Sequence, residues 1–118
     1  MIFIHGLKNC DTCRSALKWL ASENIDHEFR DVRKDGLSED DIQHWLSEVG
    51  PDTLVNRRGT TWRQLDEVEK LVSSDEDLIE LLLKYPALIK RPVFVAGEAV
   101  IVGFKDEQKA TVKERRFS

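Results

Sequence analysis

The chain has 118 residues, of which 41% are hydrophobic and 34% charged, and its formal net charge is −4 at pH 7. This length suits one domain, and the composition excludes an intrinsically disordered chain. The negative net charge argues against a nucleic-acid-binding protein, and no apolar run approaches the roughly 20 residues that span a membrane. Because the first apolar run, residues 1–4, is too short for the core of a signal peptide, we expect a cytoplasmic protein.

The N-terminal third of the sequence predicts a strand, a helix and a second strand. Residues 2–5 form a short apolar run that ends at Gly6, which indicates a buried strand. Apolar residues then recur at helical spacing over residues 11–23, and alternating residues over 25–32 indicate the second strand. This order predicts a βαβ unit whose two strands are parallel.

The middle of the chain predicts helices. Ser38 is a good N-cap, and the apolar spacing after it predicts a helix that ends at residues 50–51, Gly-Pro. A weaker helical pattern covers residues 65–72, and a stronger one covers 78–83. We therefore expect a helical insertion at about residues 37–85.

The last third of the sequence returns to strands. Two β-branched runs, residues 93–95 and 100–102, flank the pair Gly-Glu at 97–98, which suits a hairpin turn. A charged helix is expected from about Asp106. Without the insertion, the order of elements is that of a thioredoxin-like α/β fold with a mixed four-stranded sheet (βαβ…ββα). We therefore expect a single thioredoxin-like domain over residues 1–118 that carries the helical insertion.

The two cysteines, Cys10 and Cys13, stand where the first predicted helix begins. Two cysteines are too few for a disulfide-stapled secreted domain or a zinc ribbon, so we expect no metal site. The unpaired N–H groups of a helix N-terminus favour a thiolate, and Lys8 and Arg14 add positive charge nearby. Cys10 is predicted to be the reactive thiol and Cys13, which starts the apolar face of the helix, the buried resolving thiol. The alternatives are that Cys10 alone is reactive, or that both cysteines are ordinary half-buried residues.

Two short basic segments lie beside glycine or proline. They are residues 57–63 (Arg-Arg-Gly-Thr-Thr-Trp-Arg) and residues 89–92 (Ile-Lys-Arg-Pro). Guanidinium groups, together with backbone N–H groups beside a glycine, can hold an anion. The alternative is that these arginines are ordinary solvent-exposed side chains.

Four motifs, taken in order, resemble the arsenate-reductase (ArsC/Spx) family, and most closely its YffB-like branch. They are residues 6–12 (GLKNCDT), 56–65 (NRRGTTWRQL), 86–92 (PALIKRP) and 102–104 (VGF). The resemblance implies a thioredoxin-like fold with a helical insertion. It also implies that Cys10 is the reactive cysteine, that Arg91 faces it, and that Pro92 is a cis-proline beside the thiol.

The resemblance also implies an activity. YffB-like proteins are generally regarded as glutathione-dependent thiol reductases, so we expect a cytoplasmic thiol–disulfide reductase whose Cys10 adduct is resolved by Cys13 or by glutathione. We expect a monomer with no bound cofactor, with glutathione as co-substrate and a thiol or disulfide as substrate. The residues expected to bind glutathione or another anion are Lys8, Asn9, Thr12, Arg14, Arg57, Arg58, Arg91 and Pro92.

Two departures from the family pattern keep two alternative functions open. Glutathione- or glutaredoxin-dependent arsenate reductases have Gly-Thr-Ser-Arg after the cysteine and a further arginine after the hairpin, where this chain has Asp-Thr-Cys and Lys105. Cys13 is not general in the YffB-like branch, whereas a pair of cysteines at this spacing is typical of Spx regulators, which bind the RNA polymerase α-subunit. The alternatives are therefore an arsenate reductase and a Spx-like redox-sensing regulator.

Overall fold

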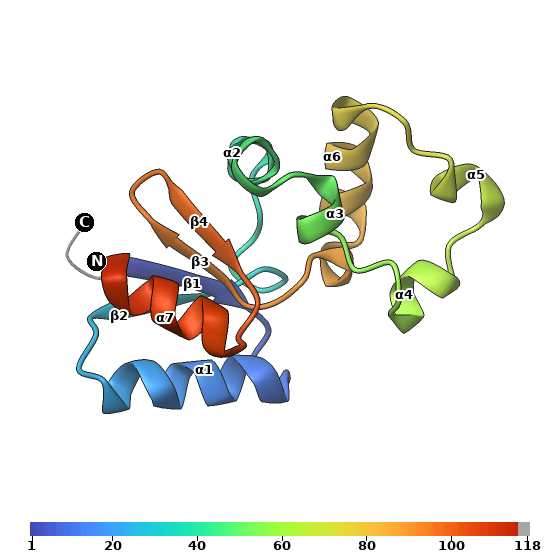
Figure 1. The fold of residues 1–118 in the computed structure, drawn as a ribbon. Coiled ribbons are helices and arrows are strands. Elements are labelled where there is room, and N and C mark those ends of the chain that lie inside the picture. The colour runs from blue at the N-terminus through green and yellow to red at the C-terminus, as the bar shows by residue number, and fades with distance from the viewer. Residues whose placement is uncertain (116–118) are drawn as a thin grey trace. The chain divides into compact units, whose positions relative to one another are not determined.

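A mixed four-stranded sheet joins the two ends of the chain (Figure 1). The structure is a computed structural model that describes residues 1–115. Strands β1 (Ile2–Gly6), β2 (His27–Asp31), β3 (Val93–Ala96) and β4 (Ala99–Val102) lie in the order β2-β1-β3-β4. Strand β2 runs parallel to β1, whereas β3 is antiparallel to both β1 and β4. This is the α/β, thioredoxin-like sheet that the sequence predicts.

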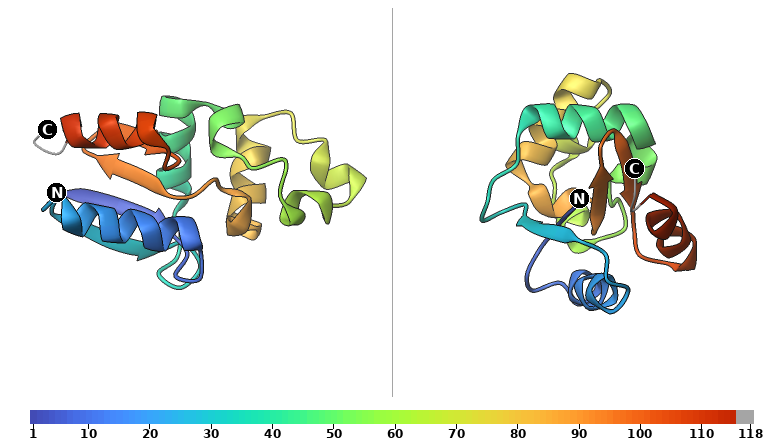
Figure 2. Two further views of the ribbon diagram at one scale, coloured as in Figure 1. Left: turned by 60° about the horizontal axis from the view of Figure 1, so that its bottom comes forward. Right: turned by 90° about the vertical axis from the view of Figure 1, so that its left-hand side faces the viewer.

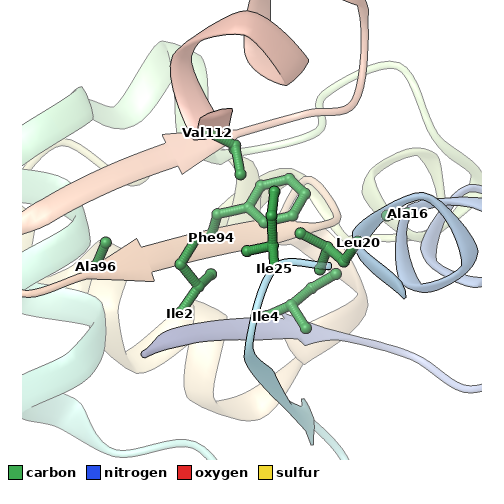
Figure 3. Close-up of a cluster of buried hydrophobic side chains, with 8 residues drawn as sticks. All are labelled: Ile2, Ile4, Ala16, Leu20, Ile25, Phe94, Ala96 and Val112. Carbon is green, nitrogen blue, oxygen red and sulfur yellow. The ribbon is translucent and has the colours of Figure 1, made fainter. Parts of the chain in front are cut away.

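Two helices, α1 (Asp11–Ser22) and α7 (Asp106–Arg115), pack on the same face of this sheet (Figure 2). Their buried side chains share one hydrophobic cluster with the strands, and its largest member is Phe94 of β3 (Figure 3). The cluster comprises Ile2, Ile4, Ala16, Leu20, Ile25, Phe94, Ala96 and Val112. Burying a side chain as large as Leu or Phe contributes about 1.5–3 kcal/mol, so this cluster fixes α1 against the sheet.

The chain forms two compact units. The sheet unit comprises Met1–Gly36 and the chain from Arg91 onward, and the helical unit comprises Leu37–Lys90. Among residues 1–115, no helix is both long and apolar enough to cross a membrane.

The helical unit carries its own core. Its elements are α2 (Glu39–Val49), α3 (Pro51–Leu54), α4 (Thr60–Arg63), α5 (Glu67–Lys70), α6 (Asp75–Lys84) and the 3₁₀ helix η1 (Pro86–Leu88). Ser38 and Ser74 cap α2 and α6, because each hydroxyl accepts a hydrogen bond from a backbone N–H of the first turn. Trp45 of α2 and Leu82 of α6 are buried.

Part of the predicted helical pattern is wrong in detail. The weak pattern over residues 65–72 becomes the single turn α5, which Asp66 starts through a capping box with Glu69. Of that apolar set only Leu65 is buried, whereas Val68 and Leu71 are 79% and 77% exposed. The end predicted for α2 at Gly50 is correct, but Pro51 starts α3, since proline suits the first position of a helix.

Candidate active site

Cys10 is the N-cap residue of α1. Its backbone is extended, with φ −99° and ψ 122°, and its carbonyl oxygen accepts a hydrogen bond from the Arg14 N–H at 3.0 Å. Its own N–H donates to the carbonyl oxygen of Leu7 at 3.2 Å, which closes the short loop between β1 and the helix. The thiol is half-buried, so it stands at the positive end of the helix and stays within reach of a reactant.

The surroundings of Cys10 favour its thiolate. Partial burial acts to raise the pKa of this thiol, but hydrogen bonds from the backbone N–H and the thiol of Cys13, and from the Arg91 guanidinium, outweigh it. The positive charge of Arg91 acts in the same direction. The pKa of Cys10 therefore lies below the ordinary value of a cysteine, as a nucleophilic thiol requires.

Cys13 lies one turn further along α1 and has no solvent-exposed surface. The pKa of this thiol is raised to about 11, chiefly by burial and also by the adjacent Cys10 sulfur, against the opposing effects of the Leu7 N–H and Arg91. Both thiols are free. The two cysteines therefore differ: Cys10 is accessible and has a lowered pKa, whereas Cys13 is buried and protonated at neutral pH.

This difference predicts selective alkylation. At neutral pH a thiolate-specific reagent should modify Cys10 and leave Cys13 intact, because only the Cys10 pKa is lowered while that of Cys13 is about 11. The rate at Cys10 should reach half its maximum below the pH at which a free cysteine peptide does so. Peptide mass spectrometry after timed alkylation between pH 5 and 10 measures both rates, and equal rates at the two positions would contradict the assignment.

Arg91 and Pro92 lie directly before β3 in the chain. The peptide bond between them is cis, and Pro92 is buried while Arg91 is partly exposed. The Pro92 carbonyl oxygen accepts a hydrogen bond from the Gly103 N–H at 2.9 Å, which joins the start of β3 to the turn after β4. Gly103 has φ +103°, a conformation that favours glycine.

The other residues predicted near Cys10 have different surroundings. Arg14 is exposed and forms an ion pair with Asp11 at 3.2 Å, and Asn9 and Thr12 are exposed. Lys8 is exposed too, and its backbone N–H donates to Asp31. The guanidinium of Arg91 lowers the pKa of Cys10 through a hydrogen bond and its charge.

Arg57 and Arg58 belong to the helical unit. Arg57 pairs with Asp52 at 2.6 Å and lies over the ring of Trp62, with its guanidinium carbon 5.6 Å from the ring centroid. Arg58 is exposed, and its backbone N–H donates to the side chain of Asn56. The segment predicted as an anion-holding loop forms the single turn α4 from Thr60 onward. Among residues 1–115, no three His, Cys, Asp or Glu side chains gather into a metal site.

Comparisons with known proteins identify the family. The ArsC family profile matches residues 5–112. An uncharacterized protein of Haemophilus influenzae is 42% identical over 108 residues, which cover 92% of this chain and 95% of that protein. The solved structure of a YFFB protein (PA3664) superposes with a TM-score of 0.88 and 37% identity, over 94% of this chain and 97% of that chain. The chain belongs to the ArsC family. The resemblance that the four motifs carry is thereby confirmed.

Proteins with a regulatory name are also similar to this chain. A global transcriptional regulator Spx from Streptococcus pyogenes is 31% identical over 111 residues, which cover 92% of this chain and 81% of Spx. Proteins similar to this chain thus carry names for different functions, so the chemistry of the site must guide the functional proposal.

Sequence reasoning missed two residues that shape this ArsC site. Gly6, the last residue of β1, faces Cys13, and a β-carbon added at Gly6 would overlap the Cys13 sulfur. Asp31, the last residue of β2, accepts hydrogen bonds from three backbone N–H groups. The signal for Gly6 was its place at the end of a buried strand next to the cysteine motif. The signal for Asp31 was a carboxylate at the end of the neighbouring parallel strand.

The contact with Cys13 predicts that Gly6→Ala lowers the free energy of unfolding by about 1–3 kcal/mol, the usual effect of overpacking a filled core. Gly59→Ala is a matched control, because a β-carbon there meets only the Asn56 side-chain amide, which can move. Urea denaturation of both variants measures the difference. Equal stability of Gly6→Ala and the unmodified protein would show that Cys13 is not closely packed against β1.

Proposed function

We propose that this ArsC-family protein is a thiol–disulfide oxidoreductase that uses glutathione as reductant and Cys10 as nucleophile. The observation that carries the proposal is the half-buried Cys10 thiol at the N-terminus of α1, whose thiolate Arg91 stabilises. A thiolate of lowered pKa is the reactive form in disulfide exchange. Cys13, buried and with a pKa of about 11, is not suited to make the first attack.

The reaction proceeds by two exchanges in this proposal. The Cys10 thiolate attacks the glutathione sulfur of a mixed disulfide, the old S–S bond breaks, and the substrate leaves as a thiolate that takes a proton from water. Cys10 is then bonded to glutathione. A second glutathione thiolate attacks the glutathione sulfur of this adduct, which releases oxidised glutathione and restores the Cys10 thiolate. Overall, the mixed disulfide and one reduced glutathione give the substrate thiol and oxidised glutathione.

Glutathione is the better candidate for the resolving thiol. Cys13 could also attack the adduct, forming a disulfide with Cys10 that two glutathione molecules would reduce. Adduct formation removes the Cys10 charge that helps to raise the pKa of Cys13, but burial, the larger cause, remains. The thiolate fraction of Cys13 therefore stays small, and free glutathione reacts with the adduct faster.

Arg91 has a second role in this proposal, which is to hold an anionic group of the substrate. Its guanidinium can donate a pair of parallel hydrogen bonds to a carboxylate, and glutathione carries two carboxylates. Lys8, Asn9, Thr12 and Arg14, on the exposed side of the cysteine motif, are proposed to contact the same tripeptide. Arg57 and Arg58, in the helical unit, are proposed to bind an anionic group.

Arsenate reduction ranks lower as a function for this chain. A site for arsenate must stabilise a small dianion as the arsenic–sulfur bond forms, which needs several converging cations. At the position after the hairpin the chain carries Lys105, whose ammonium group cannot form the bidentate contact of an arginine. Loss of one such contact slows a reaction about 10²–10³-fold.

A turnover assay tests the proposal. The purified protein receives a small glutathione mixed disulfide or arsenate, in both cases with reduced glutathione, and oxidised glutathione is measured with glutathione reductase and NADPH. We expect saturable reduction of the mixed disulfide and arsenate turnover at least about 10²-fold slower. Fast arsenate turnover, or no turnover of the mixed disulfide, would refute the proposal. In the first case Lys105 would be the first residue to replace.

The similarity to Spx favours a second candidate function, a redox-sensing regulator. Two adjacent thiols that act on each other's pKa could form a disulfide as a switch, and a 31% identical relative bears the Spx name. Pull-down with the RNA polymerase α-subunit, before and after oxidation, discriminates between the two functions. Redox-dependent capture without mixed-disulfide turnover would favour the regulator.

We further propose that the protein works as a monomer in the cytoplasm, where reduced glutathione would keep both thiols free. Size-exclusion chromatography with light scattering tests the monomer.

A further inference from the structure

Asp31 carries a buried negative charge that takes no part in the proposed disulfide exchange at Cys10. It ends β2, is 7% exposed, and is the one buried polar or charged side chain among residues 1–114. One of its carboxylate oxygens accepts hydrogen bonds from the backbone N–H groups of Arg33 at 2.8 Å and Lys34 at 2.9 Å. The other oxygen accepts from the Lys8 N–H at 3.4 Å, across 23 residues of sequence.

The Lys8 N–H belongs to the loop that sets the position of both thiols. In this loop the Leu7 carbonyl oxygen accepts the Cys10 N–H at 3.2 Å, and the Leu7 N–H stabilises the Cys13 thiolate. The loop starts at Gly6, which pairs with Asp31 in the β1–β2 register. Asp31 thus contacts this loop one residue after Leu7 and two residues before Cys10.

We propose that Asp31 is a positioning residue that holds the β1–α1 loop so that Cys10 keeps its place at the helix N-terminus. The functional meaning of this inference rests on the proposed role of Cys10 as nucleophile. Asp31 acts through the loop and touches no reactant, so it is not a catalytic residue.

The ionised carboxylate is what this role requires. The Lys34 N–H and, to a lesser degree, those of Arg33 and Lys8 lower the pKa of Asp31 against the opposing effect of burial, so the group is charged at neutral pH. Its two oxygens accept three N–H groups. An asparagine offers one acceptor oxygen and an NH₂ group, which leaves at least one of these N–H groups facing a donor.

Positioning and direct electrostatics predict opposite effects on Cys10. Removing a negative charge would by itself favour the thiolate, whereas releasing the loop would move Cys10 away from the N–H groups and from Arg91, which disfavours it. The hydrogen bonds that lower the pKa of Cys10 come from Cys13 and Arg91, and both depend on where the loop places Cys10. The positioning effect should therefore prevail.

The test is the pH profile of Cys10 alkylation in Asp31→Asn. We expect about threefold less thiolate at any pH below the midpoint, and faster hydrogen exchange at the Lys8 N–H. Asp35→Asn is the matched control, because the Asp35 carboxylate accepts the Asp31 N–H at 2.8 Å in the same turn but does not contact Lys8. Its alkylation profile should match that of the unmodified protein. An unchanged or more reactive Cys10 in Asp31→Asn, or an equal change in Asp35→Asn, would overturn the proposal.

A measurement on the unmodified protein covers the case in which Asp31→Asn does not fold. Acid titration followed by NMR should move the amide signals of Lys8, Arg33 and Lys34 together, at a midpoint below the ordinary value of an aspartate. The Cys10 amide should shift at the same midpoint. The other ionisable groups facing Asp31 are Lys8 and Asp35, and Asp35→Asn separates any signal change that Asp35 causes. A Cys10 amide that does not respond would overturn the proposal.

Both readouts use the protein without substrate. Absence of mixed-disulfide turnover would therefore refute the proposed function and leave the role of Asp31 standing, whereas an unaltered Cys10 profile would refute the role of Asp31 alone.

Discussion

Replacing Cys10 with serine is expected to abolish glutathione-dependent disulfide reduction, with a loss of at least about 10³-fold in kcat/KM. A serine hydroxyl at the N-terminus of α1 is not ionised at neutral pH and cannot exchange with a disulfide. The remaining thiol, Cys13, is fully buried and has a pKa of about 11, so it does not replace the lost nucleophile. The assay is the same NADPH-linked measurement of oxidised glutathione.

Cys13→Ser is the matched control for this prediction. It removes one sulfur from the same helix, and we expect it to keep most of the activity, because free glutathione resolves the Cys10 adduct. Near-complete loss of activity in Cys13→Ser would mean that an internal disulfide is obligatory. Measurable turnover in Cys10→Ser would mean that the nucleophile is misassigned.

Arg91→Ala has the second largest expected effect, a loss of about 10- to 100-fold in kcat/KM, as for one hydrogen bond to a charged group. The variant removes both the hydrogen bond and the positive charge that lower the pKa of Cys10. The alkylation midpoint of Cys10 should therefore move to higher pH. Arg91→Lys should recover part of the thiolate but less of the activity, since an ammonium group keeps the charge and loses the fork of donors.

Arg30→Ala is a control for the loss of one positive charge. Arg30 lies on β2 of the same unit, pairs with Glu28 at 2.8 Å and lies over the ring of Phe3. We expect its activity and its Cys10 alkylation profile to remain unchanged. If Arg30→Ala and Arg91→Ala had the same effect, the overall charge of the protein would be responsible, and the local contact between Arg91 and Cys10 would not.

The sequence predicted the sheet unit well because local patterns encode it. Alternation and apolar runs marked the strands, and the spacing of Cys13, Ala16 and Leu20 marked the buried face of α1. The turn at Gly97, with φ +61°, was marked by glycine in a two-residue hairpin loop. Each of these signals lies within one element or one turn, so a single sequence suffices to read it.

The site was less predictable because its contacts join distant segments. Sequence proximity pointed to Lys8 and Arg14 as the charges beside Cys10, but Arg14 pairs with Asp11. Arg91, which lowers the pKa of Cys10, lies 81 residues further along the chain, and only the family resemblance indicated it. The role of Asp31 was not predicted for the same reason, because the hydrogen bond that it accepts from the Lys8 N–H joins residues 23 positions apart.

The helical unit shows a different limit of pattern reading. Over residues 65–72 the apolar spacing suits one helix. The capping box at Asp66 instead begins a separate helical turn, which ends at Lys70. Val68 and Leu71 therefore face solvent, so spacing alone did not show which apolar residues enter the core.

Glutathionylation of the reduced protein tests the central claim most directly. The unmodified protein, Cys10→Ser and Cys13→Ser are incubated with oxidised glutathione at neutral pH, and the adducts are located by peptide mass spectrometry. If Cys10 is the activated nucleophile, Cys13→Ser carries one glutathione on Cys10, and Cys10→Ser carries none because Cys13 is buried and protonated. Glutathione on Cys13 in the Cys10→Ser protein, or an unmodified Cys10 in Cys13→Ser, would contradict the account.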